Sequence, residues 1–190
     1  MIHENAWTTY GADDLRKLEG LSADYIDFLN HGKTERECAQ LIVEMARGNG
    51  YRDLAEVIAN GETLKKGDRV YAVNMDKMVM LVNVGEDIVN HGMNIIGAHI
   101  DSPRLDIKQN PLYESEELAY LDTHYYGGIK KYQLVTIPLA LHGVVVKKDG
   151  TTVTINIGEK EDDPVFIISD LLIHLSAEQM KKTDATVIEG

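Results

Sequence analysis

The stretch that decides the fold is "NIIGAHIDSPRLDIKQNP", residues 94–111, in which an apolar run ends in a histidine and an aspartate. Apolar residues at successive positions predict a short strand over Met93–Ala98 that is buried on both faces. His99 then stands at the C-terminal end of this strand, where α/β sheets build their sites. Pro103 stops the strand from continuing and helps to fix the following loop.

The spacing of His99 and Asp101 admits two interpretations. A neutral imidazole at a strand end can bind a metal ion through one nitrogen, while a nearby carboxylate orients the ring through the other. Asp101 is close enough in sequence to be that carboxylate. A histidine at a strand end can also simply hydrogen-bond a loop, so the spacing alone leaves both interpretations open.

The charge and hydropathy of the chain limit the classes of function. Its 190 residues include 19 Lys plus Arg against 31 Asp plus Glu, which gives a formal net charge of −12. This balance argues against a surface that binds nucleic acid or an anionic membrane. The longest apolar stretch, Leu134–Val146, is interrupted by Pro138 and Gly143 and is too short to span a bilayer. We expect no nucleic acid and no membrane among its partners.

The N-terminus and the single cysteine favour a cytoplasmic protein. The first residues, "MIHENAWTTYGADD", lack the basic start and apolar stretch of a signal peptide. Cys38 has no second cysteine with which to form an internal disulfide. It shares one face of a predicted helix with Leu41, Ile42 and Met45, so we interpret it as an inert core thiol and not as a nucleophile.

The first fifty residues are predicted to be helical. Asp13–Gly32 carries leucines and aromatic residues among charges, and Gly20 is expected to divide it into two helices. The next helix begins with a capping box, in which Thr34 caps the helix and Glu37 reaches back to the cap. Gly48 is expected to end it.

Strands follow the helices. "RVYAV" (69–73) and "VMLVNV" (79–84) flank a short turn and read as two paired strands. After Pro111 the sequence pattern predicts strands separated by turns in the segments 117–128, 132–159 and 164–169. Lys147–Gly150 is typical of a hairpin turn. The order predicts an α/β segment over residues 1–108 and a β-rich segment over residues 109–190.

Several motifs in order resemble one family. "GAHIDSPRLDIKQNPLYE" (97–114), "THYYGGIKKYQLVTIPLALHGVVVKKDG" (123–150) and "DLLIHL" (170–175) are similar to the aspartyl aminopeptidase (aminopeptidase I-like) family of zinc exopeptidases. "ENAW" (4–7), "FLNHGKTERE" (28–37) and "KKGDRVY" (65–71) also fit its bacterial members. The resemblance spans nearly the whole chain.

The resemblance implies a mixed-sheet α/β catalytic domain interrupted by an inserted β-rich dimerisation domain, and assembly into tetrahedral dodecamers. It implies an active site with two zinc-type ions that act on the free N-terminus of a peptide, with cobalt or manganese as open alternatives. His99 matches the first metal-ligand histidine, and Asp101 matches the acidic residue that orients it. His174 matches a histidine that reaches into a neighbouring subunit's active site; without the resemblance, a core or interface histidine is the simpler interpretation.

The same resemblance predicts that the chain is an N-terminal part of an aminopeptidase. The family's remaining metal ligands and its glutamate base match no position up to Gly190. One imidazole does not hold a catalytic zinc ion, so we expect the chain to be inactive alone. Two functions stay open: a metalloaminopeptidase part, with acidic N-terminal residues as substrates if it follows the eukaryotic branch, and a non-catalytic assembly or binding module of the same fold.

Overall fold

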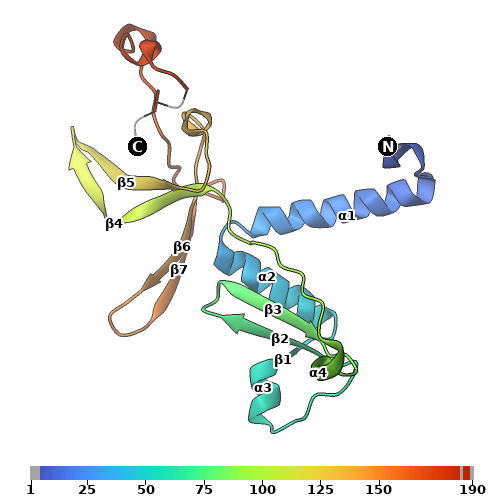
Figure 1. The fold of residues 1–190 in the computed structure, drawn as a ribbon. Helices are drawn as coiled ribbons and strands as arrows, with labels where there is room; N and C mark the ends of the chain where they lie inside the picture. The colour runs from blue at the N-terminus through green and yellow to red at the C-terminus, as the bar shows by residue number, and fades with distance from the viewer. Residues whose placement is uncertain (1–4, 185, 189–190) are drawn as a thin grey trace. The chain divides into compact units, whose positions relative to one another are not determined.

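The computed structural model describes residues 5–184 and 186–188, and the chain divides into two compact units between Asp101 and Ser102. In the first unit the elements are η1 (Ala6–Thr8), α1 (Ala12–His31), α2 (Glu35–Gly48), β1 (Arg52–Asp53), α3 (Leu54–Ala59), β2 (Arg69–Asn74), β3 (Met78–Asn83) and α4 (Ile88–His91) (Figure 1). The sheet has the order β1-β2-β3, with β1 parallel and β3 antiparallel to β2. The mixed α/β fold predicted from the sequence is therefore present.

Helix α1 is continuous, so the predicted division at Gly20 is wrong. A glycine inside a helix loses about 1 kcal/mol relative to alanine, yet it keeps the N–H that the helix ladder requires. No atom beyond the local backbone lies within 4 Å of a Cβ built at Gly20. Close packing therefore does not require glycine at this position.

Helix α2 begins as predicted and supplies one side of the core. The Glu37 N–H donates to Thr34 Oγ1 at 3.3 Å, and Glu37 Oε2 accepts from the Thr34 N–H at 2.9 Å. This reciprocal pair satisfies two N–H groups that the first turn would otherwise leave without a partner. Helix α2 contacts β2 and β3, and the buried hydrophobic residues of the unit are Cys38, Ala39, Ala46, Val57, Val70 and Tyr71.

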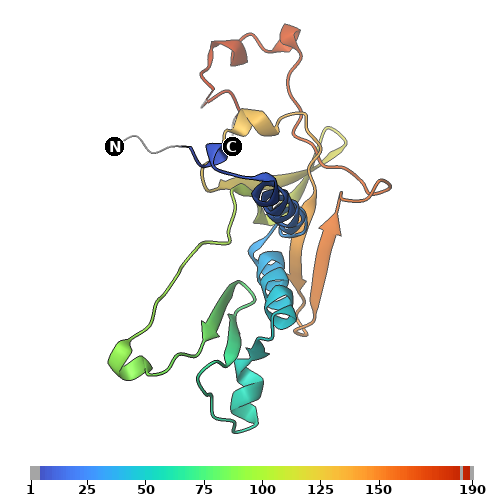
Figure 2. The same ribbon diagram turned by 90° about the vertical axis from the view of Figure 1, so that its right-hand side faces the viewer.

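The segment Met93–Ala98 is not a strand, and the prediction of a buried one is wrong. Figures 1 and 2 draw it as an open trace after α4, and the side chain of Ile96 is 98% exposed. A strand requires a neighbouring strand for its backbone groups and a packed layer for its apolar side chains. Within the described residues, no strand pairs with this segment.

The second unit is built from hairpins. Its elements are β4 (Arg104–Ser115), β5 (Leu118–Tyr126), η2 (Lys131–Leu134), β6 (Leu141–Val146), β7 (Thr152–Ile157), η3 (Ile173–Leu175) and η4 (Gln179–Lys181). Strand β4 pairs with β5 and β6 pairs with β7, both antiparallel, and the predicted hairpin turn at Lys147–Gly150 is confirmed. The region is β-rich, as expected.

Two details of this unit differ from the expectations. The segment 164–169, which was predicted to be a strand, does not form a continuous one. It makes only the isolated bridges Leu139↔Phe166 and Val135↔Ile168. Strand β4 runs across the predicted boundary between residues 108 and 109. The assignment of 1–108 to a catalytic domain and 109–190 to an inserted domain stays a prediction.

Among the described residues, no helix combines the length and apolar character needed to cross a membrane.

Gly158 is a position where the second unit requires glycine. Its φ is +105°, and a Cβ there would lie 3.0 Å from the Cα of Ala140. We expect Gly158→Ala to destabilise the β6–β7 hairpin by roughly 1–3 kcal/mol, through backbone strain and this close approach. Hydrogen exchange of the β6 and β7 amides measures the change. Gly143→Ala is the control, since its Cβ meets open space; equal exchange in the two variants would contradict the account.

Cys38 is expected to react slowly. The residue is 6% exposed, and burial, followed by the charges of Glu37 and Glu35, raises the pKa of its thiol. Because the thiolate is the reactive form, alkylation by iodoacetamide at pH 8 should be about tenfold slower or more in the folded chain than in urea. Equal rates, followed by mass spectrometry, would show that the thiol is accessible and ionised.

Candidate metal centre

The structure brings His99 and Asp101 together. His99 Nδ1 lies 2.9 Å from the backbone oxygen of Asp101 and 3.2 Å from its carboxylate Oδ1. A carbonyl oxygen can only accept a hydrogen bond, so Nδ1 carries the proton in this contact. In the neutral ring Nε2 then has a lone pair, which is the form of histidine that binds a metal ion.

This pair fits one ligand position and its orienting carboxylate, and it does not form a complete metal site. The His99 side chain is 83% exposed. In the part of the chain that the structure describes, no group of three or more His, Cys, Asp or Glu side chains is arranged to hold a metal ion. A catalytic zinc ion takes about three protein ligands, so His99 and Asp101 by themselves do not make such a site.

The loop after Asp101 is anchored in the second unit by contacts that the sequence did not reveal. Arg104 Nε donates to Asp106 Oδ1 at 2.7 Å, and its guanidinium lies 4.2 Å from the centre of the Tyr126 ring. Gly127 has a φ of +73°, and a Cβ there would touch Pro103 at 3.4 Å. These contacts hold the start of β4 against the end of β5.

His174 lies in the second unit, in the one-turn helix η3, and is exposed. Buried Ser176 closes the turn through its hydroxyl, which donates to the Ile173 carbonyl at 3.0 Å. Gln179 Nε2 donates to Asp170 Oδ1 at 2.9 Å and ties the two ends of the segment together. Sequence reasoning singled out His174 but missed this support, because Ser176 carries no motif.

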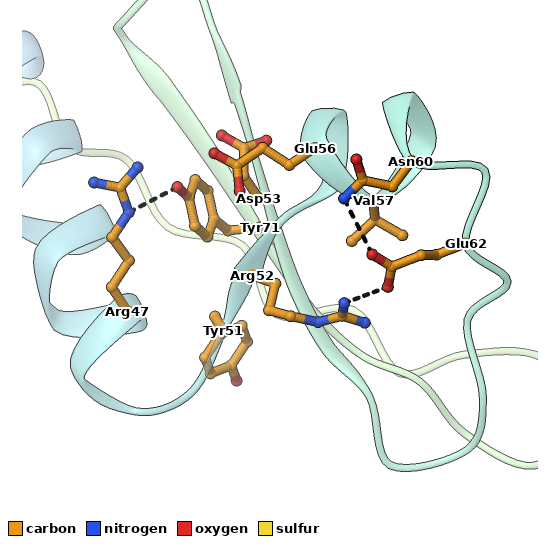
Figure 3. A pocket seen from close by; sticks show the side chains of 9 residues that line it. All are labelled: Arg47, Tyr51, Arg52, Asp53, Glu56, Val57, Asn60, Glu62 and Tyr71. Atoms are coloured by element: carbon orange, nitrogen blue, oxygen red, sulfur yellow. Dashed lines mark hydrogen bonds and ion pairs between the residues drawn. The ribbon is translucent and has the colours of Figure 1, made fainter.

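A cavity of about 420 Å³ lies in the first unit between α2, α3 and the sheet (Figure 3). It is lined by Arg47, Tyr51, Arg52, Asp53, Glu56, Val57, Asn60, Glu62 and Tyr71. Arg47 Nε donates to Tyr71 Oη at 2.9 Å, and Arg52 pairs with Glu62 at 2.5 Å, which lowers the pKa of that carboxyl. The first contact connects α2 to β2, and the second connects β1 to the loop that follows α3.

Comparisons with known proteins agree with the motifs. The family model described as "Aminopeptidase I zinc metalloprotease (M18)" matches residues 28–188. A protein named "Probable M18 family aminopeptidase 1" from Clostridium acetobutylicum is 52% identical over 188 residues, which are 99% of this chain and 40% of that protein. The chain therefore belongs to the M18 family of aminopeptidase I zinc metalloproteases.

Solved structures support the same assignment. The crystal structure of aminopeptidase I from Clostridium acetobutylicum is 50% identical, with a TM-score of 0.84 over 100% of this chain and 42% of that one. An M18 aminopeptidase from Thermotoga maritima is 40% identical, with a TM-score of 0.87 over 98% of this chain and 39% of that one. The chain spans about 40% of the length of the curated relatives it matches.

The hydrogen bond between Arg47 and Tyr71 in the cavity wall is expected to stabilise the first unit. Tyr71 is buried, and Tyr71→Phe removes its hydrogen bond to Arg47 while keeping the ring. We expect a loss of about 1–2 kcal/mol in the free energy of unfolding of the first unit, measured by urea titration. Tyr25→Phe, at an exposed position of α1, is the matched control and should change little. A loss of the same size in both variants would contradict a structural role for the bond.

Proposed function

We propose that the chain supplies part of the active site of a metalloaminopeptidase, which removes N-terminal residues from peptides. The observation that carries the proposal is the His99–Asp101 contact, which places the proton on Nδ1 and leaves Nε2 for a metal ion. Membership of a family described as zinc metalloproteases supports this use of the histidine. Zinc is the proposed metal, with cobalt and manganese as alternatives, and the protein is proposed to be cytoplasmic.

In the complete enzyme, a two-metal centre would activate a water molecule and polarise the scissile carbonyl. The part played by this chain is narrower. His99 would bind one ion through Nε2, and Asp101 would keep the proton on Nδ1 and fix the orientation of the ring. A general base and the other ligands would come from polypeptide outside the described residues, so we propose that the chain alone is inactive.

His174 is proposed to act in a neighbouring subunit. It is exposed between apolar residues, since Leu172 and Leu175 are 72% and 70% exposed, and such a segment favours contact with another polypeptide. From there its imidazole could stabilise the oxyanion that forms on the substrate, which would make self-association a condition of activity. A dodecamer is the proposed assembly, and acidic N-terminal residues are the proposed substrates.

A non-catalytic assembly or binding module is the second candidate. The observation that favours it is that no group of three or more His, Cys, Asp or Glu side chains among the described residues is arranged to hold a metal ion. A module of this kind would keep the exposed apolar surface of the second unit and would carry no chemistry. The two candidates differ in one respect that can be measured: whether His99 supports hydrolysis when the rest of an M18 enzyme is present.

A chimera tests the proposed function. The 190 residues replace the matching part of the Clostridium acetobutylicum relative, and hydrolysis of Asp-, Glu- and Leu-p-nitroanilide is measured with zinc, cobalt or manganese. We expect activity in the chimera and none in the chain alone. His99→Ala should remove the activity, and Asp101→Asn should lower kcat/KM about 10–100-fold, since an outer carboxylate of a metal ligand typically has that effect.

Asp162→Asn is the control for Asp101→Asn, because Asp162 is an exposed loop carboxylate. A well-folded chimera without activity would support the binding module. Activity of the chain alone, removed by His99→Ala, would show that the chain and its copies provide the whole site and would contradict the proposed incompleteness.

A further inference from the structure

We propose that three polar residues, Asp170, Ser176 and Gln179, are positioning residues for His174. They preform the turn that carries this imidazole, so that the turn is ordered before it meets a neighbouring subunit. The inference rests on the proposed function, because His174 has a reaction to act on only if the chain is part of an aminopeptidase. The preformed turn itself stands on hydrogen bonds within residues 170–182.

Packing contributes little to the order of this turn. The apolar residues on both sides of His174 are all exposed, namely Leu171, Leu172, Ile173 and Leu175. A segment with few buried apolar contacts opens locally at a low free-energy cost. The order of the turn therefore depends on the hydrogen bonds that the segment makes within itself.

Ser176 closes the turn two residues after His174. It is buried, and its backbone N–H and its hydroxyl both donate to the Ile173 carbonyl, at 3.3 and 3.0 Å. Its own carbonyl accepts from the Met180 N–H at 2.8 Å, so the residue joins η3 to η4. A buried hydroxyl without a partner is unfavourable, so the bond from the Ser176 side chain favours the closed turn.

A second contact closes the segment around His174. Asp170 Oδ1 accepts from the Leu171 N–H at 2.8 Å and from Gln179 Nε2 at 2.9 Å. The bond to Gln179 joins residues nine positions apart and makes a closed loop, with His174 near its middle. The charge of Asp170 is not required for this geometry, since an amide oxygen can accept the same two bonds.

An ordered turn matters for the role proposed for His174. A group that stabilises an oxyanion has to lie about 3 Å from the place where the negative charge develops. A displacement of about 1 Å can lower the rate about 100-fold. A segment that orders only on contact also loses binding free energy to that ordering, whereas a preformed turn does not. Asp170, Ser176 and Gln179 therefore act through His174.

Hydrogen exchange of the 190-residue chain alone tests whether the turn is preformed. The amides of Ser176 and Met180 donate within the turn, so we expect them to exchange about tenfold or more slower than in an unfolded peptide. Asp170→Ala should reduce this protection about fivefold, because it removes the bond that closes the loop. Asp170→Asn should keep the protection, as should Asp162→Ala, which changes an exposed loop carboxylate.

Kinetics of the chimera with the Clostridium acetobutylicum relative test the link to His174. Asp170→Ala and Ser176→Ala should each lower kcat about tenfold and change KM less than about twofold, because they displace a group that acts in the transition state. Asp170→Asn should restore kcat. In a His174→Ala background neither substitution should lower kcat further, since both act through that imidazole. A purely structural role would instead add to the effect of His174→Ala.

Three outcomes would overturn the inference: free exchange of the Ser176 and Met180 amides in the chain alone, unchanged kcat in Asp170→Ala, or a further loss of kcat in the His174→Ala background. The proposed function fails in a different way. A well-folded but inactive chimera refutes the enzyme, and an active chimera that tolerates His174→Ala refutes the role of His174. Either result also removes the positioning role, while protection of the two amides still shows a preformed turn.

Discussion

A catalytic zinc ion needs about three protein ligands, and under the proposed function this coordination requirement governs how the chain can act. Under our proposal His99 supplies one of these ligands through Nε2, because Nδ1 is held by Asp101. The ring orientation comes from residues two apart in sequence, so it forms without the rest of the enzyme. The position of that ring in a finished site depends on ligands that the described residues do not bring together.

The same division between local and distant contacts runs through both units. The capping box of α2 and the β6–β7 hairpin are complete within short stretches of chain. In contrast, Met93–Ala98 and the apolar residues around His174 lie exposed at the two places where the family resemblance puts catalytic histidines. Under our proposals, the turn that carries His174 forms beforehand, and both histidines become parts of an active site only when further polypeptide meets them.

The sequence predicted what short-range contacts determine. Thr34 and Glu37 lie three residues apart, and their spacing was sufficient to predict the capping box. The spacing of His99 and Asp101 left two interpretations open, and the structure shows that Nδ1 of His99 contacts Asp101. The prediction for Met93–Ala98 assumed neighbouring strands, which periodicity alone does not supply. Ser176 and the Arg47–Tyr71 contact were missed, because the serine has no motif and the second pair joins residues 24 positions apart in sequence.

The most direct test of the account is a zinc titration of the isolated 190-residue chain and of its chimera with the Clostridium acetobutylicum relative, monitored by competition with a chromophoric chelator. We predict no stoichiometric zinc binding by the chain alone at micromolar concentrations, and tight binding by the chimera that His99→Ala weakens. One tightly bound zinc ion per isolated chain, lost in His99→Ala, would contradict it.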